Sequence, residues 1–136
     1  MAQEIVFVDA NIFLEIALKN EKSEACKKFL HKILSGEIDA CTSDFIVYSC
    51  LLQIHYKSKD MKQMENFLLF LSTLNLEIIR PSYRDLSRAL EYMKKFSLDL
   101  DDALVVACIT SHGIKILVSL DTDFDKVSIV QRRVPE

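Results

Sequence analysis

The sequence lacks the cysteine spacing of a disulfide-bonded or zinc-binding protein. It has four cysteines in 136 residues, with no Cys-x-x-Cys pair and no regular spacing. Each of them lies among apolar neighbours in an expected helix or strand. We therefore expect buried, reduced thiols rather than a disulfide framework or a zinc site. The four residues are Cys26, Cys41, Cys50 and Cys108.

Long apolar segments and an excess of positive charge are also missing. No run approaches the length that spans a bilayer, and the first apolar stretch is short and followed by an acid. We therefore expect no membrane segment and no signal peptide, and we expect a cytoplasmic protein. Acids outnumber bases by 20 to 17, which gives a net charge of −3. Any nucleic acid would have to be met by a local patch or a bound cation.

Apolar residues are plentiful, and their arrangement predicts the fold class. Half of the residues are hydrophobic, which is enough for one core, and the chain is too short for two domains. We expect a single domain over residues 1–136. Strands are expected at 5–8, 39–42, 76–79 and 115–120, with a last short strand at Ile129 and Val130. Helical patterns occupy the intervals between the first four strands.

Strands that alternate with helices predict a parallel sheet covered on both faces. The expected fold class is thus α/β, a three-layer α/β/α sandwich around a central, mostly parallel sheet of four to five strands. The run Ile5 to Val8 shows no polar alternation, which is typical of a strand buried on both faces.

Acids follow the buried strands of this expected sheet. Asp9 ends the first strand, Asp121 follows the strand at 115–120, and Asp102 opens the helix that leads into that strand. Open α/β sheets place their sites beyond the carboxyl ends of the strands, so these three acids can converge. The helix dipole explains an acid at a helix N-terminus, and it accounts for Asp101 more easily than for Asp102.

Converging carboxylates predict a bound cation. They repel one another and stay ionised together at neutral pH only if a cation compensates their charge. Oxygen ligands without cysteine or a histidine pair favour Mg²⁺ or Mn²⁺. Such an ion activates a water and stabilises charge on a phosphate. The implied substrate is a phosphodiester.

Three motifs surround these acids: Val-Asp-Ala-Asn at 8–11, Asp-Ala-Leu-Val-Val-Ala at 102–107 and Ser-Leu-Asp-Thr-Asp-Phe at 119–124. Together they resemble the PIN-domain family, as in VapC-type toxins and related archaeal proteins, over nearly the whole chain. The resemblance implies a small nuclease, usually dimeric, that cuts RNA with Mg²⁺ or Mn²⁺. It also implies a toxin–antitoxin pair, with an antitoxin protein as partner.

The resemblance also implies roles for individual residues. It assigns metal-binding acids to Asp9, Asp102 and Asp121, a further acid to Asp123, and supporting roles to Asn11, Ser43 and Ser119.

One position departs from the family pattern. The family has a glutamate about six residues beyond a serine or threonine in the helix after the second strand, and counting from Ser43 places Ser49 there. A serine cannot supply that charge. The metal site is therefore weakened, rebuilt with Glu15 or Asp44, or lost.

Three functions remain open at this point. The first is a metal-dependent endoribonuclease. The second is a PIN-fold module that holds RNA or a protein partner without cutting, which Ser49 favours. The third is phosphoryl transfer by an aspartyl-phosphatase or response-receiver protein. It ranks last, because the expected Asp-x-Asp is Asp9-x-Asn11 and no lysine follows a later strand in the expected place.

The helix expected at 61–74 bears on oligomeric state. Its segment Phe67 to Leu71 is apolar nearly all the way round, whereas a surface helix of a small monomer shows a stripe. We expect a homodimer that covers the excess. The alternative is a helix fully inserted into the core of its own domain.

Overall fold

A computed structural model describes residues 4–136, so residues 1–3, at the start of the expected domain, lie outside the described range. Within that range the chain forms five strands, six α-helices and one short 3-10 helix. The strands are β1 (Ile5–Val8), β2 (Asp39–Ser43), β3 (Glu77–Ile79), β4 (Ile116–Val118) and β5 (Gln131–Arg133). The helices are α1 (Ala10–Ala17), α2 (Ser23–Leu34), α3 (Asp44–Ser58), α4 (Met61–Thr73), α5 (Tyr83–Phe96), α6 (Leu100–Ser111) and the 3-10 helix η1 (Thr122–Lys126).

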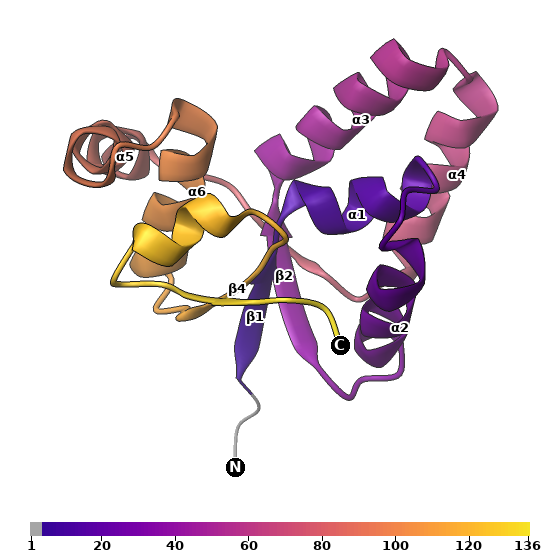
Figure 1. Ribbon diagram of the computed structural model, residues 1–136, viewed down its shortest axis with the longest axis horizontal. Coiled ribbons are helices and arrows are strands. Elements are labelled where there is room, and N and C mark those ends of the chain that lie inside the picture. Colours follow the sequence, from indigo (N-terminus) through magenta and orange to yellow (C-terminus); the bar gives the residue numbers. More distant parts are fainter. Residues whose placement is uncertain (1–3) are drawn as a thin grey trace.

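The five strands form one parallel sheet in the order β3-β2-β1-β4-β5. In the centre of the sheet, Val6 of β1 is paired with Ala40 of β2 and with Ile116 of β4. Helices α1 to α4 lie to one side of the sheet, and α5 and α6 lie to the other (Figure 1). The predicted α/β/α sandwich with a parallel sheet is therefore confirmed.

The apolar runs of the sequence become the inner strands of the sheet. Phe7 and Val8 of β1 and Leu117 of β4 are 0% exposed. Both strands have neighbouring strands on either side and helices on both faces. Helix α6 buries seven consecutive residues, 103–109, between the sheet and α5. This packing holds the carboxyl ends of β1 and β4 and the start of α6 in fixed positions.

The prediction of a last strand at Ile129 and Val130 is wrong. Ile129 lies in a turn and is exposed, and the strand starts at Gln131. β5 is an edge strand that joins the sheet through backbone hydrogen bonds to β4. An edge strand buries little side-chain surface, so its residues carry no apolar pattern that would reveal it.

Helix α4 is not inserted into the core of its own domain. Phe67 is its one buried residue, whereas Leu68 and Leu69 are 47% and 66% exposed. The alternative that the core accounts for the whole apolar segment is therefore wrong. The prediction for the cysteines is confirmed, since all four are buried free thiols. Among the described helices, none has the length and hydropathy needed to cross a membrane.

Candidate metal centre

The carboxyl ends of β1 and β4 meet at the point where the order in which strands are added to the sheet reverses. β2 and β3 extend the sheet on one side of β1, and β4 and β5 extend it on the other. Ligand sites of open α/β sheets lie at such a switch point. Here the backbone N–H of Asp9, directly after β1, donates to the carbonyl oxygen of Val118 at 3.0 Å. Asp9 therefore lies beside the segment that leads to Asp121.

Three donors fix the Asp9 carboxylate. The N–H of Ala10 donates to Oδ1 at 2.8 Å, which caps α1. The hydroxyl of Ser119 donates to Oδ2 at 2.7 Å, and Asn11 Nδ2 donates to the same oxygen at 3.3 Å. With 6% of its surface exposed, Asp9 has one orientation.

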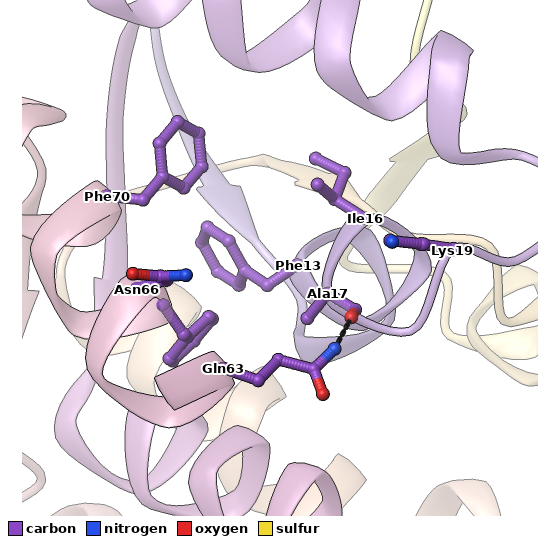
Figure 2. A pocket seen from close by; sticks show the side chains of 8 residues that line it. Phe13, Ile16, Ala17, Lys19, Gln63, Asn66 and Phe70 are labelled. Carbon is purple, nitrogen blue, oxygen red and sulfur yellow. Dashed lines mark hydrogen bonds between the residues drawn. The ribbon is translucent and has the colours of Figure 1, made fainter. Parts of the chain in front are cut away.

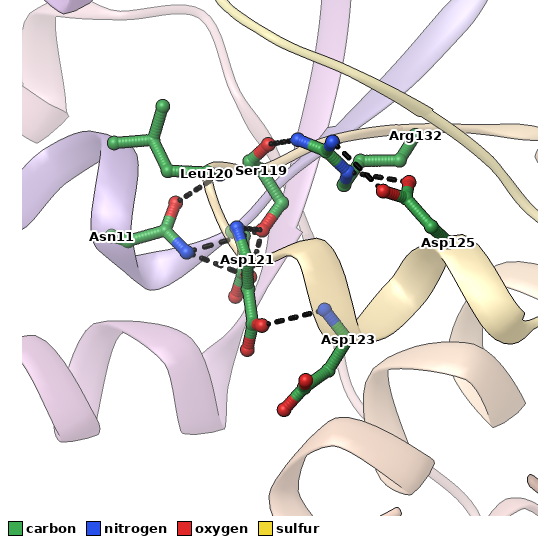
Figure 3. Close-up of polar contacts among 8 residues, drawn as sticks. Asn11, Ser119, Leu120, Asp121, Asp123, Asp125 and Arg132 are labelled. Carbon is green, nitrogen blue, oxygen red and sulfur yellow. Dashed lines mark hydrogen bonds and ion pairs between the residues drawn. The ribbon is translucent and has the colours of Figure 1, made fainter.

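Asn11 and Ser119 also connect the ends of the two strands (Figure 3). Asn11 Nδ2 donates to Ser119 Oγ at 3.1 Å, and Asn11 Oδ1 accepts from the N–H of Leu120 at 3.1 Å. The same Ser119 oxygen accepts from the N–H of Asp121 at 3.0 Å. One hydroxyl thus fixes Asp9 through its proton and Asp121 through its lone pair.

Three further acids come close together at this edge of the sheet. Asp102, Asp121 and Asp123 each place one carboxylate oxygen within 4.8 Å of the others. Asp102 is in the first turn of α6, and Asp121 caps η1 by accepting from the N–H of Asp123 at 2.9 Å. Carboxylate oxygens at this spacing are the donor set that Mg²⁺ or Mn²⁺ prefers.

The electrostatics of the acids also fit a cation. Burial raises the pKa of Asp102 to about 7, and repulsion from Asp101, Asp121 and Asp9 adds to the rise. Burial likewise raises the pKa of Asp9, against the lowering effect of its hydrogen bonds from Ser119 and Ala10. Among the described residues, none that lines the cavity at this site is basic. A divalent ion would compensate this negative charge.

Asp9, Asp102 and Asp121 line a cavity of about 430 Å³, whereas Asp123 is not part of its lining. We call its charged side the acidic wall, made of Asp9, Asp101, Asp102 and Asp121. We call the opposite side the neutral wall, made of Leu14, Phe45, Ile46, Ser49 and Gln53 of α1 and α3. On the neutral wall, Gln53 Nε2 donates to Ser49 Oγ at 3.4 Å.

The structure does not bring every expected residue to the cavity. Ser43 is buried as the cap of α3, where its hydroxyl accepts from the N–H of Ile46 at 3.2 Å. Ser49 lines the cavity, as the family spacing implies.

The two acids considered as replacements for the family's glutamate lie elsewhere. The carboxylate of Glu15 accepts from Asn20 Nδ2 at 2.9 Å and from the N–H of Lys22 at 3.0 Å. It therefore holds the loop after α1, because the first helix turns this side chain away from the sheet edge. Asp44 accepts from its neighbour's backbone N–H and lies 3.5 Å from Arg80 Nε. Neither supplies a charge to the neutral wall.

Two residues of the site carry no clear signal in the sequence. Asp101 lines the cavity, although the helix dipole alone explains an acid at that position. Arg132 contacts the backbone of Ser119 from β5. Both are set by how distant segments pack together, which no local pattern reveals.

Comparison with known proteins agrees with this architecture. The chain is similar to VapBC2 from Rickettsia felis, which was crystallised bound to a DNA fragment from their promoter. The TM-score is 0.77 at 15% identity, over 97% of this chain and 99% of that one. It is similar to VapC20 from Mycobacterium tuberculosis, a Sarcin-Ricin loop cleaving toxin, with a TM-score of 0.74 at 15% identity over 93% and 97% of the two chains. A toxin-antitoxin complex from Klebsiella pneumoniae gives a TM-score of 0.72 at 19% identity, over 96% and 98%.

At these identities the solved structures show a shared fold. No curated protein matched the sequence. The model of the PIN domain matches residues 6–130, nearly the whole chain. This chain therefore belongs to the PIN domain family.

Proposed function

We propose that this chain is a metal-dependent endoribonuclease and the toxin of a toxin–antitoxin pair. The observation that carries the proposal is the meeting of Asp102, Asp121 and Asp123, whose carboxylate oxygens lie within 4.8 Å of one another. Membership of the PIN domain family supports it, as does the fold shared with VapC20, a toxin that cleaves the Sarcin-Ricin loop.

Asp102, Asp121 and Asp123 would hold Mg²⁺ or Mn²⁺, with the other acids of the acidic wall beside them. Bound there, the ion supplies an activated water and neutralises charge on a phosphodiester. Burial and the neighbouring acids raise the pKa of Asp102 to about 7, so Asp102 would hold the cation as a carboxylate once that charge is compensated. Ser119 and Asn11 keep Asp9 in a single orientation beside the cluster.

The proposal is tested by cleavage of single-stranded RNA in Mn²⁺ with Asp9→Asn. The substitution removes a charge that the site needs, and the loss of several kcal/mol of transition-state stabilisation lowers the rate about 100-fold or more. Asp39→Asn is the matched control, since Asp39 is an exposed acid at the opposite, amino end of the sheet. Equal cleavage by Asp9→Asn and the native chain would remove the nuclease proposal.

A second candidate function is binding without cleavage, and the neutral wall favours it. Ser49 stands at the position of the family's glutamate, and neither Glu15 nor Asp44 replaces that charge. The native chain would then bind RNA or a protein partner in Mn²⁺ and leave RNA intact. The same cleavage assay, run at an RNA concentration that saturates binding, distinguishes the two functions.

This chain has an apolar surface that suits the proposed antitoxin partner. Two adjoining hollows of about 220 and 210 Å³ lie between α1, α2 and α4, and both are lined by Ile16 and Phe70. Figure 2 shows Phe13 and Phe70 facing one of them, with the amide of Gln63 bonded to the carbonyl of Ala17. We infer that a partner inserts an apolar segment here. An antitoxin that restores the growth of cells expressing this chain should fail to do so against Phe70→Asp.

We also propose a homodimer. Exposed apolar residues on α3 and α4 support it, among them Tyr48, Leu52 and Leu69, which are 58%, 54% and 66% exposed. A second copy would remove this surface from water. Light scattering at micromolar concentration, on the native chain and on Leu69→Glu, measures the mass directly.

A further inference from the structure

Arg132 joins the edge strand β5 to both segments that follow β4. Its Nε and Nη2 donate to the two carboxylate oxygens of Asp125 at 2.7 and 3.1 Å. Its Nη1 donates to the backbone oxygen of Ser119 at 3.0 Å (Figure 3). The side chain is 15% exposed, so this one guanidinium is packed between β4 and η1.

The two partners of Arg132 belong to the segments that carry the acids. Ser119 holds Asp9 through its hydroxyl, and its backbone oxygen is the one that Arg132 binds. Asp125 belongs to η1, the helix that Asp121 caps. A 3-10 helix of five residues has little stability of its own. The buried side chains of Phe124 and Val127 anchor η1 to the core, and Lys126 Nζ donates to the backbone oxygen of Ser97. Arg132 is the side chain that joins η1 to the backbone at the end of β4.

We propose that Arg132 is a positioning residue: its guanidinium fixes η1 against the carboxyl end of β4, so that Asp121 and Asp123 face Asp102 at the spacing needed to share one ion. The part of this inference that concerns the ion rests on the proposed function. The part that concerns the placement of the acids rests on the contacts alone.

The shape of the guanidinium is what makes this possible. Its N–H groups lie in one plane and match the two oxygens of a carboxylate, while another N–H remains for the carbonyl. A lysine at this position keeps the charge but cannot make the paired contact. Arg132 is also absent from the cavity lining, so it places the acids without occupying the position of a cation.

The next residue provides a matched control. Arg133 has the same side chain on the same strand, and its guanidinium lies 3.8 Å from the exposed carboxylate of Glu4. Half of its side chain is exposed. It contacts neither Ser119 nor Asp125 through its side chain in the described structure.

The test compares Arg132→Lys, Asp125→Asn and Arg133→Lys in two measurements. The first is amide hydrogen exchange by NMR in the metal-free chain at Asp121 and Asp123, whose N–H groups donate to Ser119 Oγ and Asp121 Oδ1. We expect exchange about tenfold faster in Arg132→Lys and Asp125→Asn, and less than about twofold faster in Arg133→Lys. The second is Mn²⁺ affinity by calorimetry, which should fall about tenfold in the first two variants alone.

Each outcome decides a separate point. Unchanged exchange at Asp121 and Asp123 in Arg132→Lys overturns the inference, whether or not Mn²⁺ binds. Equally faster exchange in Arg133→Lys overturns it too, because that result would show that either substitution loosens β5 as a whole. If the native chain binds no Mn²⁺, the proposed function fails while the exchange rates still decide the role of Arg132. If Arg132→Lys does not fold, Asp125→Asn breaks the same contact from an exposed position.

Discussion

The two walls of the cavity belong to the same fold and differ completely in charge. Every carboxylate that lines it belongs to the acidic wall, whose residues follow β1 and β4 or open α6. The neutral wall, from α1 and α3, offers one hydroxyl and one amide among apolar side chains. An ion bound in this cavity would therefore be held from one side.

This asymmetry has an electrostatic consequence for the metal-free chain. Burial, with repulsion from the neighbouring acids adding to it, already raises the pKa of Asp102 to about 7. A glutamate on the neutral wall would add another negative charge to the cavity and strengthen the repulsion. Ser49 thus spares the metal-free protein this repulsion, and it would leave a bound ion without a carboxylate ligand on this side.

Removing a charge from the acidic wall should have the largest effect. We expect Asp121→Asn to lower Mn²⁺ affinity at least about 100-fold, since Asp121 lies in the cluster with Asp102 and Asp123 and the loss of an anionic ligand leaves the cation undercompensated. Asparagine still caps a helix, so the thermal unfolding temperature should change little. Calorimetric titration measures the affinity. Retention of native affinity would show that the ion does not depend on the acidic wall.

Adding a charge to the neutral wall should have the next largest effect. Ser49→Glu supplies the carboxylate that this wall lacks, and we expect Mn²⁺ affinity to rise about tenfold. His55→Glu is the matched control, because it adds the same charge to an exposed position of the same helix, α3. A Ser49→Glu chain that binds Mn²⁺ no better than His55→Glu would show that the neutral wall does not face the ion.

The same contrast explains how much could be predicted from sequence. The acids at Asp9 and Asp121 follow apolar runs, and parallel strands necessarily bring their carboxyl ends to one edge of the sheet. The apolar pattern predicts the inner strands well because it reports side-chain burial. It misses the edge strand Gln131–Arg133, which is held in place by backbone hydrogen bonds to β4.

A local sequence pattern does not predict the direction in which an individual side chain points. Glu15 in α1 and Ser49 in α3 belong to helices that both border the cavity, but Glu15 turns to the loop after α1 while Ser49 lines the cavity. Arg132 depends on contacts with Asp125, seven residues earlier, and with Ser119, directly after β4. These directions follow from the packing of whole elements, which a local pattern does not contain.

The smallest effect concerns Asp102 and pH in the metal-free chain. Because burial raises the pKa of the folded-state carboxyl from 3.8 to about 7, the folded chain binds more protons than the unfolded chain between those values. Stability should therefore fall as the pH rises from about 4 to about 7. Asp102→Asn removes this contribution. At pH 8 the variant should be more stable than the native chain by about 1 kcal/mol, since partial solvent access weakens the effect.

Urea unfolding at pH 5 and pH 8 without metal measures this difference, with Asp39→Asn as the control at the far end of the sheet. Saturating Mn²⁺ should raise the stability of the native chain at pH 8 and leave that of Asp102→Asn nearly unchanged, because a ligand that binds only the folded state stabilises it by mass action. The two walls then account for both results: the charge that destabilises the empty cavity is the charge that binds the ion. A native chain whose metal-free stability is no lower at pH 8 than at pH 5, relative to Asp102→Asn, would contradict the crowding of charge on the acidic wall.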